Sequence, residues 1–338
     1  MILSWVVPLY NCAGYIGRCI ESLQKQRIAE YDYEIIIVDD ESSDNGTTIV
    51  EAYRQRHRNI SLLRQPHQGP GVARNNGMKV CRGKYVAFAD ADDVIRPNAV
   101  GEILRALTVN HTLEFDAIGF NHRNFTDIAE ISPINEHVKI SFHAYRMYDF
   151  CCVHGFRANS VDYIFKREFL RKYGISFPNY KVGEDLTFML DVYALHDALI
   201  AYTPTIVYLY FQRTGSLSNS TNASQALKDF DTLCDIQHKI LHSKSLAIYP
   251  QDVRDKCSLD FVQSQAIIKL LAASLKMPDL KELFAKAYTS GLFPFRATCG
   301  TIMSLLSILS QNPRFTNLAS YLYRYVYVPL IRNRRTHR

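Results

Sequence analysis

Three aspartates follow a short apolar segment in the stretch GKYVAFADADDVIRP, which runs from Gly83 to Pro97. Side chains alternate between the two faces of an extended chain, so Asp90 and Asp92 are expected to point to the same side if the extended path continues. Two converging carboxylates repel each other unless a cation lies between them. Hard divalent ions such as Mg²⁺ and Mn²⁺ prefer such oxygen ligands and share them with substrate phosphates. The simpler alternative is that Asp92 or Asp93 caps the helix that Pro97 helps to start.

A second acidic pair, Asp39 and Asp40, ends an earlier apolar segment in the stretch IIIVDDESSDNG. Carboxylates at the carboxyl edge of a parallel sheet can accept hydrogen bonds from a nucleobase N–H or a ribose hydroxyl. On its own, this pair is equally compatible with a solvated turn in which Asp44 caps the next helix. The presence of two acidic strand ends in one chain favours a binding site over two unrelated caps.

The segments that would position these acids alternate between strand-like and helical patterns. Apolar runs at residues 3–8, 33–40, 60–65 and 84–90 predict strands, and the segment AGYIGRCIESLQKQ after the first run places apolar residues on one helical face. Strands that alternate with helices pair in parallel and form an α/β sheet. Right-handed crossovers then bring the strand ends to one edge of the sheet, where ligands usually bind.

The composition of the 338-residue chain is typical of a globular protein, with 47% hydrophobic and 21% charged residues. The net charge of +6 suggests only a mild affinity for anions. No C-x-x-C pair occurs among the eight cysteines, so we expect no zinc ribbon but buried thiols in a reducing cytosol. The start, MILSWVVPLYN, lacks the basic segment of a signal peptide, and the longest apolar run, ATCGTIMSLLSIL, is too short to span a bilayer.

The order of these segments resembles that of family 2 glycosyltransferases with the GT-A fold. SWVVPLYNCAGYIGRCIESLQKQ resembles the opening strand and helix of the family, and EIIIVDDESSDN resembles its V-D-D-G-S-x-D segment, with Glu41 where Gly is usual. QGPGVARNNGMKVCRGKYVAFADADD resembles its A-R-N-x-G…D-x-D-D signature. The resemblance covers the first hundred residues closely and the next hundred loosely.

The resemblance implies an α/β fold of the GT-A type, Rossmann-like, with a mostly parallel central sheet flanked by helices and a helical C-terminal extension. We expect a catalytic domain over residues 1–218, with a nucleotide-sugar-binding half at 1–108 and an acceptor-binding half at 109–218. Helical patterns dominate residues 219–338 and predict a separate helical region.

The resemblance also implies a donor site for a nucleotide-sugar, usually linked to UDP. The expected donor-binding residues are Pro8, Tyr10, Asn11, Asp39, Asp40, Arg74, Asp90, Ala91 and Arg213. Asp92, together with Asp90, would bind Mn²⁺ or Mg²⁺ at the diphosphate, where the cation neutralises charge on the departing UDP.

A third acidic pair, Glu184 and Asp185, lies in the stretch KVGEDLTFMLDVY. Leu186, Met189 and Leu190 predict a helix that starts near Glu184, and acids in a first helical turn can simply be stabilised by the helix dipole. The resemblance, however, places a general base here. Asp185 would take the proton from an acceptor hydroxyl, and Glu184 would position hydroxyl groups. One base with direct attack inverts the anomeric centre.

Two basic segments lie further along the chain. VYLYFQRTGSLSNS resembles a family loop that folds over the donor, in which Arg213 pairs with the diphosphate; the alternative is a surface charge. Residues 315–338 combine tyrosines with arginines, as membrane-interface segments do. We expect this tail to contact the inner membrane surface, and a final packed helix with a basic end is the alternative.

The sequence thus predicts an inverting, metal-dependent glycosyltransferase of bacterial surface-polysaccharide assembly, that is, lipopolysaccharide core, O-antigen or capsule. The donor would be a UDP-hexose or a derivative, and the acceptor a saccharide or a lipid-linked saccharide. The protein would be cytoplasmic and peripheral to the inner face of the cytoplasmic membrane. A metal-dependent nucleotidyltransferase is one alternative, but VPLYNCAGY is not a Gly-rich phosphate loop. A non-catalytic nucleotide-sugar-binding protein is another, and we expect no nucleic-acid partner.

Overall fold

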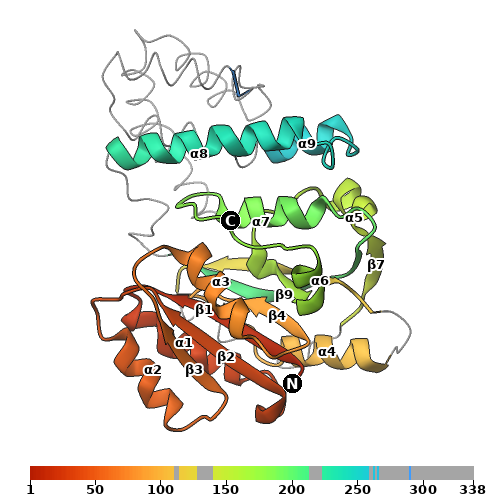
Figure 1. The fold of residues 1–338 in the computed structure, drawn as a ribbon. Coiled ribbons are helices and arrows are strands. Elements are labelled where there is room, and N and C mark those ends of the chain that lie inside the picture. Colours follow the sequence, from red (N-terminus) through yellow and green to blue (C-terminus); the bar gives the residue numbers. More distant parts are fainter. Residues whose placement is uncertain are drawn as a thin grey trace. The chain divides into compact units, whose positions relative to one another are not determined.

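The computed structural model describes residues 1–109, 114–127, 140–212 and 223–258, together with residues 262, 265, 289 and 290. The chain divides into two compact units (Figure 1). The first unit comprises Met1–Val153 and Ala158–Ser216, and the second comprises His154–Arg157 and Leu217–Arg338. All residues of the three acidic pairs belong to the first unit, and Arg213 lies outside the described residues.

A single sheet of nine strands organises the described part of the first unit, in the order β3-β2-β1-β4-β8-β6-β9-β5, with β7 paired to β9. The strands are β1 (Leu3–Leu9), β2 (Tyr33–Asp39), β3 (Ile60–Arg64), β4 (Tyr85–Phe88), β5 (Val94–Ile95), β6 (Ala117–Phe125), β7 (His143–Arg146), β8 (Tyr163–Lys166) and β9 (Leu199–Phe211). The first four strands in this order are parallel, as the alternation of strands and helices predicts. The other half is mixed, because β8 runs antiparallel to both β4 and β6.

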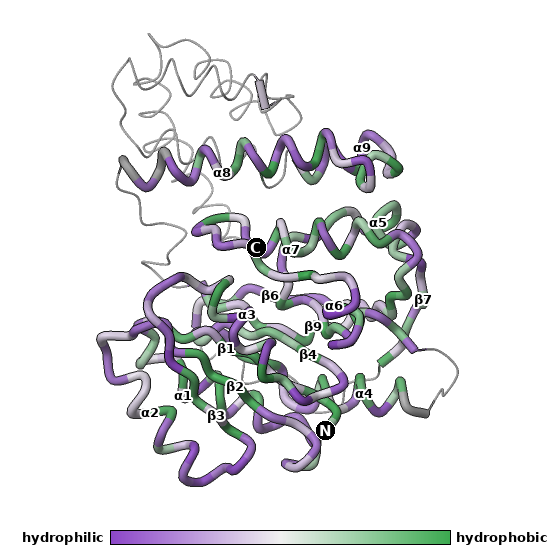
Figure 2. Tube along the Cα trace, in the orientation of Figure 1, coloured by the Kyte–Doolittle hydropathy of each residue, from purple (hydrophilic) through white to green (hydrophobic). Residues whose placement is uncertain are grey.

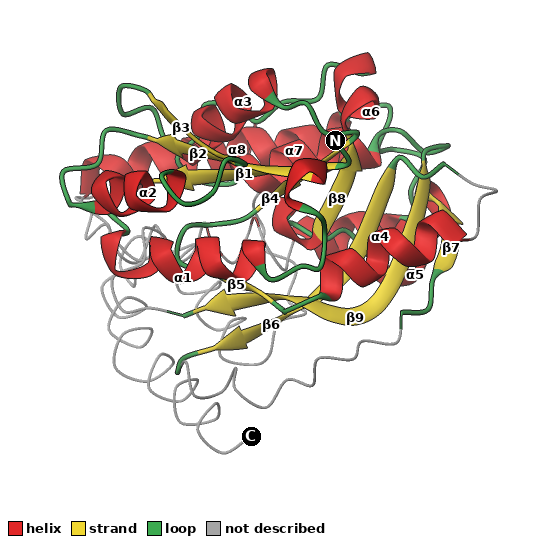
Figure 3. Cartoon of the chain, turned by 90° about the horizontal axis from the view of Figure 1, so that it is seen from below, coloured by secondary structure: helices red, strands yellow, loops and turns green. Residues whose placement is uncertain are grey.

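Helices cover both faces of the sheet (Figure 3). They are α1 (Ala13–Gln24), α2 (Gly46–Arg54), α3 (Pro70–Val80), α4 (Ala99–Val109), α5 (Met147–His154), α6 (Arg167–Lys172) and α7 (Glu184–Tyr193), with short 3₁₀ turns at η1 (Glu30–Asp32) and η3 (Ser160–Asp162). Helix α3 packs directly on β1 and β2. A Cβ atom on Gly77 would come within 2.3 Å of Val6 Cγ1, so only glycine permits this close approach.

The core of the first unit consists of apolar strands and an aromatic cluster. Every side chain of β2 is buried, and Figure 2 shows mainly hydrophobic colour along the middle of β2. Phe88, the last residue of β4, meets Phe177 and Phe188 edge-on, with ring centroids 5.0 and 5.8 Å apart. Phe177 and Phe188 stack at 4.1 Å. Because Phe188 belongs to α7, this cluster fixes the end of β4 against α7.

Parallel pairing brings the acidic strand ends to one edge of the sheet. Leu9 of β1 is in register with Asp39 of β2, and Val6 is in register with Phe88 of β4. The residues that follow these positions are Tyr10, Asp40 and Asp90, within two residues of the strand ends. The sheet therefore delivers both acidic pairs of the amino-terminal half to the same edge.

The described part of the second unit is helical, with α8 (Ala223–His242) and α9 (Gln251–Cys257). Phe230, Leu233 and Ile240 are buried on one face of α8. The hydroxyl of Ser258 donates a hydrogen bond of 2.6 Å to Gln237, which joins α8 to the end of α9. Within the described ranges, no helix is both long and apolar enough to cross a membrane. Residues 315–338 lie outside the described residues, so their membrane contact stays a prediction.

Candidate active site

The aspartates after β4 occupy a tight turn. The backbone N–H of Asp93 donates to the carbonyl of Asp90 at 3.0 Å. Asp93 is buried, and its carboxylate accepts hydrogen bonds from the hydroxyl of Tyr208 at 2.6 Å and from the N–H of Phe211 at 2.7 Å. The Tyr208 hydroxyl in turn accepts the N–H of Asp90 at 3.0 Å. Asp93 therefore anchors the turn to β9 and leaves Asp90 and Asp92 as the carboxylates nearer the surface.

A buried arginine joins Asp90 to the acidic pair Glu184 and Asp185. Arg74 of α3 is only 2% exposed, and its Nη2 lies 2.6 Å from Asp90 Oδ1. Its Nη1 lies 3.3 Å from Glu184 Oε1 and 3.6 Å from Asp185 Oδ2. Burial opposes the charge of the guanidinium, but the carboxylates of Asp185, Asp90 and Glu184 together raise the pKa of Arg74. One cation thus holds together three acids that are up to 95 positions apart in the sequence.

The segment before α7 is bound tightly to α3. Asn75 donates from its side chain to the carbonyl of Phe177 at 2.8 Å and accepts the Phe177 N–H at 2.9 Å. A Cβ atom on Gly71 would come within 2.9 Å of the Pro178 carbonyl oxygen. The stretch GVARN therefore has a structural role as well as a charge, because it brings the start of α7 to Arg74.

Glu184 and Asp185 form the first turn of α7, as the sequence predicts. The hydroxyl of Ser160 donates a hydrogen bond to Asp185 Oδ1. Burial and the charge of Asp185, opposed by Arg74, raise the pKa of Glu184 to about 7. Burial also raises the pKa of Asp185, again opposed by Arg74. A carboxylate with a raised pKa is a stronger base than a solvated one, which suits proton transfer near neutral pH.

The raised pKa of Glu184 predicts a pH-dependent stability. The folded state binds this proton more tightly than the unfolded chain, whose ordinary value is 4.5. The free energy of unfolding should therefore fall as pH rises from about 4.5 to about 7, by up to about 3 kcal/mol. Urea unfolding of the wild type and of Glu184→Gln at pH 5, 6, 7 and 8 measures this slope. The wild type should lose stability relative to the variant as pH rises, and a constant difference would contradict the assignment.

Asp40 organises the loop between β3 and α3. Its buried carboxylate accepts hydrogen bonds from Gln65 Nε2 at 2.7 Å, from the Gln68 N–H at 2.8 Å and from the Gly69 N–H at 2.9 Å. His67 Nδ1 lies 2.9 Å from the second oxygen of Asp40. These four hydrogen-bond partners come from one loop. If Asp40 binds the nucleotide, as the sequence predicts, it would do so together with the groups of this loop.

The other residues expected to bind the nucleotide-sugar lie around the same edge of the sheet. Tyr10 stacks on His67 with ring centroids 4.3 Å apart. The side-chain oxygen of Asn11 accepts the Ser43 N–H at 2.8 Å, and Asp39 Oδ1 accepts the Ser42 N–H at 3.2 Å. Pro8 is half-buried within β1, and Ala91 is buried between the two aspartates of the D-x-D segment.

Glu41 occupies a backbone conformation that explains the glycine usual at this position. Its φ angle is +64°, in the left-handed region that side chains rarely adopt. Its Oε2 accepts the N–H of His67 at 3.1 Å. The carboxylate of Glu41 thus adds a local hydrogen bond to a strained turn and points to the loop that Asp40 organises.

Tyr210 is a site residue that the sequence interpretation did not identify. It lies two residues after Tyr208 on β9, so both side chains share a face of the strand. Burial and the charges of Asp90, Asp93, Asp92 and Asp185 raise the pKa of Tyr210 to about 12. The phenol is 37% exposed and stays protonated. It therefore offers an O–H donor beside Asp90, Asp92, Asp93 and Asp185, which we call the acid cluster. The period-two alternation in TIVYLYFQR is the signal that could have indicated it.

The residues after β4 fit a divalent cation. Within the described ranges, no three His, Cys, Asp or Glu side chains gather to hold a metal ion without other ligands. Asp90 and Asp92 nevertheless supply hard oxygen ligands, and burial, together with the charges of Asp90 and Asp92, raises the pKa of Asp93. Mg²⁺ and Mn²⁺ are often held by one or two carboxylates plus substrate phosphates, and Asp90 and Asp92 would supply the carboxylates of such a set.

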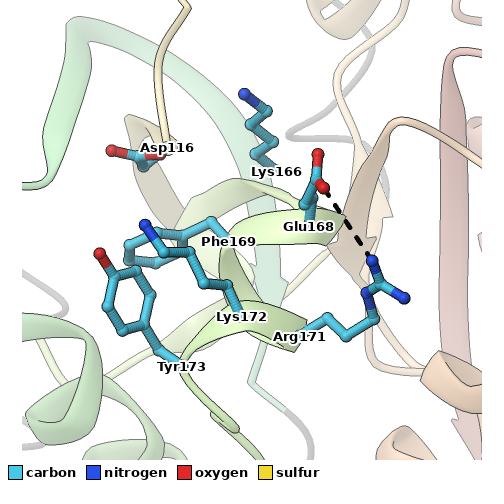
Figure 4. Close-up of a pocket in the computed structure, with 7 residues that line it drawn as sticks. All are labelled: Asp116, Lys166, Glu168, Phe169, Arg171, Lys172 and Tyr173. Carbon is cyan, nitrogen blue, oxygen red and sulfur yellow. Dashed lines mark ion pairs between the residues drawn. The ribbon is translucent and has the colours of Figure 1, made fainter.

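A separate hollow on the first unit lies away from these acids (Figure 4). Its walls come from β8, from α6 with the following Tyr173, and from Asp116 before β6, and they include Lys166 and Phe169. Lys166 is in register with Tyr85, the first residue of β4, whereas Asp90 follows the other end of that strand. None of the residues that line this hollow is expected to bind the nucleotide-sugar or the metal, or to act as the general base.

Comparisons with known proteins identify the family of this chain. Residues 4–171 match the family model of Glycosyl transferase family 2. The poly(ribitol-phosphate) beta-glucosyltransferase of Bacillus spizizenii is 37% identical over 102 residues, which cover 30% of this chain and 16% of that protein. EpsH of Bacillus subtilis, named as a glycosyltransferase, is 31% identical over 186 residues, which cover 52% of this chain and 50% of that protein. The chain thus spans half or less of the length of these relatives.

The fold is shared with a solved structure of S. aureus TarS, residues 1–349, in complex with UDP-GlcNAc. The TM-score is 0.66 at 20% sequence identity, and the match covers 96% of this chain and 92% of that one. This likeness confirms the predicted α/β fold of the GT-A type, with a curled central sheet and flanking helices.

Proposed function

Because the chain contains a glycosyl transferase family 2 domain over residues 4–171, we propose that it is an inverting glycosyltransferase that moves a sugar from a nucleotide-sugar to a saccharide acceptor. The observation that carries the proposal is the convergence of Asp90, Glu184 and Asp185 on the buried guanidinium of Arg74. This arrangement puts a donor-side carboxylate and a candidate base on either side of one fixed cation.

The residues of the chain suggest a direct displacement. Asp185, oriented by Ser160 and Arg74, takes the proton from an acceptor hydroxyl while that oxygen attacks the anomeric carbon from the face opposite the leaving diphosphate. One base and one attack invert the anomeric centre without a covalent intermediate. Glu184 and the Tyr210 hydroxyl would hold substrate hydroxyls. The protein contributes mainly positioning and fixed charges.

The donor and the acceptor are proposed from the comparisons with known proteins. TarS binds UDP-GlcNAc, and the shared fold supports a UDP-hexose or a derivative as donor. The names of the relatives support a role in bacterial surface-polymer assembly, where lipopolysaccharide core, O-antigen, capsule and poly(ribitol phosphate) are the polymers to compare. The acceptor would be a saccharide or lipid-linked saccharide, met by a cytoplasmic enzyme at the inner membrane surface through residues 315–338.

The metal is proposed at Asp92 and Asp90. A bound Mn²⁺ or Mg²⁺ supplies positive charge against the diphosphate and so eases departure of the nucleotide. Asp92→Asn keeps the side-chain volume but removes one ligand charge. We expect it to lower sugar transfer from UDP-sugars by at least about 100-fold at a fixed Mn²⁺ concentration, as loss of several kcal/mol of charge stabilisation implies.

Transfer assays with UDP-GlcNAc, UDP-glucose and UDP-galactose, with Mn²⁺ or with EDTA, test this prediction. Asp252→Asn is the matched control, because Asp252 is exposed on α9 and belongs to the second unit. The control should behave as the wild type does. Full wild-type activity in EDTA would contradict the metal, and binding of none of the three UDP-sugars in thermal-shift measurements would count against such a donor.

A further inference from the structure

His122 and Asp162 form a pair that includes none of the expected donor-binding, metal or base residues. His122 lies on β6, and its Nδ1 is 2.8 Å from Asp162 Oδ1 and 3.0 Å from Oδ2. Asp162 is 1% exposed, whereas the His122 side chain is 33% exposed. A buried carboxylate is costly unless donors satisfy it, so the proton of the imidazole belongs on Nδ1. The ring therefore presents Nε2 on its side away from Asp162.

The same short turn supports this imidazole and the candidate base. Element η3 contains both Asp162 and Ser160, whose hydroxyl donates to Asp185. Both residues are buried. A 3₁₀ turn rises about 2 Å per residue, so these two supports are only about 4 Å apart along the turn. His122 and Asp185 are thus oriented by one rigid three-residue element.

The register of β6 and β9 places His122 on the face of the sheet that carries the acid cluster. His122 is opposite Tyr208, and Asn124 is opposite Tyr210. Residues opposite each other on paired strands share a face. Tyr208 reaches Asp93 from this face, and Tyr210 is influenced by the charges of four active-site carboxylates. The opposite face carries Phe125 and Leu209, which pack with Val94 in an apolar cluster.

This face carries a partly exposed imidazole, an exposed amide and an exposed phenol, from His122, Asn124 and Tyr210. Such groups exchange hydrogen bonds with sugar hydroxyls, and an exposed aromatic ring offers an apolar surface for a sugar face. The donor-side residues lie instead at the ends of β1, β2 and β4. Tyr208 contacts the turn after β4 from this face. His122 and Asn124 lie on β6, beyond β8 in the sheet order, and the turn that supports His122 also supports Asp185.

We propose that His122, oriented by Asp162, is an acceptor-binding residue whose Nε2 accepts a hydrogen bond from a hydroxyl of the acceptor saccharide. The inference rests on the proposed glycosyltransferase function and adds the acceptor side of the same site. It gives Asp162 the role of a positioning residue, because the carboxylate acts through the imidazole.

Two substitutions at His122 separate acceptor binding from structural support. The amide nitrogen of Asn in His122→Asn falls near the place of Nδ1, so this variant retains the contact with Asp162 and loses Nε2. The longer His122→Gln places its amide near Nε2 and gives up the contact with Asp162. We expect His122→Asn to raise the acceptor KM by about 3- to 10-fold, the effect of one hydrogen bond, without a matching rise in donor KM. His122→Gln should keep an acceptor KM nearer the wild-type value and unfold more easily.

The kinetics use UDP-GlcNAc, UDP-glucose and UDP-galactose as donors, with poly(ribitol phosphate) and the methyl glycosides of glucose, galactose and N-acetylglucosamine as acceptors. His143→Asn, on the exposed strand β7, is the control and should match the wild type. An acceptor KM in His122→Asn equal to that of the wild type overturns the inference, and so does an equal rise in both KM values. A wild-type protein that transfers sugar from none of these donors contradicts the proposed function itself, and the inference falls with it.

Discussion

Asp185→Asn is expected to lower kcat by about 10²- to 10⁴-fold, the range typical of a lost general base, and to leave donor KM within about threefold of the wild type. The amide has the shape of the carboxylate and can still accept the hydrogen bond from Ser160, so the local geometry should persist. It cannot take a proton from the acceptor hydroxyl. The loss should therefore fall on the chemical step.

Steady-state kinetics with varied donor and acceptor measure this effect, with UDP binding measured separately by calorimetry. Asp197→Asn is the matched control, because Asp197 is an exposed aspartate four residues beyond the end of α7. Turnover within tenfold of the wild type would remove Asp185 as the base. A loss confined to donor KM would assign Asp185 to donor binding instead.

The positions of the acids could be predicted from the sequence where they follow or open a recognisable element. Asp90 and Asp92 follow an apolar strand, and Glu184 and Asp185 open an apolar-faced helix, so local patterns predict both pairs. Their meeting at Arg74 could not be predicted from spacing. It depends on the contact of Asn75 with Phe177 and on the aromatic cluster below α7, both of which are tertiary.

The fold shows a similar division. The parallel half, from β3 to β4, follows from strands that alternate with helices. The mixed half contains short strands such as β8, whose four residues give no periodic signal of their own. The pair of His122 and Asp162 depends on β6 and η3 meeting across 40 positions, and the sequence gives neither residue a motif.

Arg74→Met is expected to destabilise the protein by about 3 to 5 kcal/mol, the cost typical of removing one partner from a buried ionic group. Methionine replaces much of the volume but leaves Asp90, Glu184 and Asp185 as neighbouring acids without their cation. Sugar transfer should be lost as well, because the same guanidinium fixes the candidate base against the donor-side carboxylate.

The pH dependence of this loss distinguishes charge from packing. Without the cation, the acids that Arg74 stabilises in their ionised form should bind protons more readily, so the variant should recover part of its stability between pH 7 and pH 5. Urea unfolding at both pH values measures the recovery. Arg54→Met is the control: Arg54 also pairs with a glutamate, Glu51, at 2.8 Å, but both side chains are exposed, so its loss should cost less than about 1 kcal/mol. An Arg74→Met variant as mild as this control, or one whose loss is the same at both pH values, would contradict the role of Arg74 as the cation that holds the three acids together.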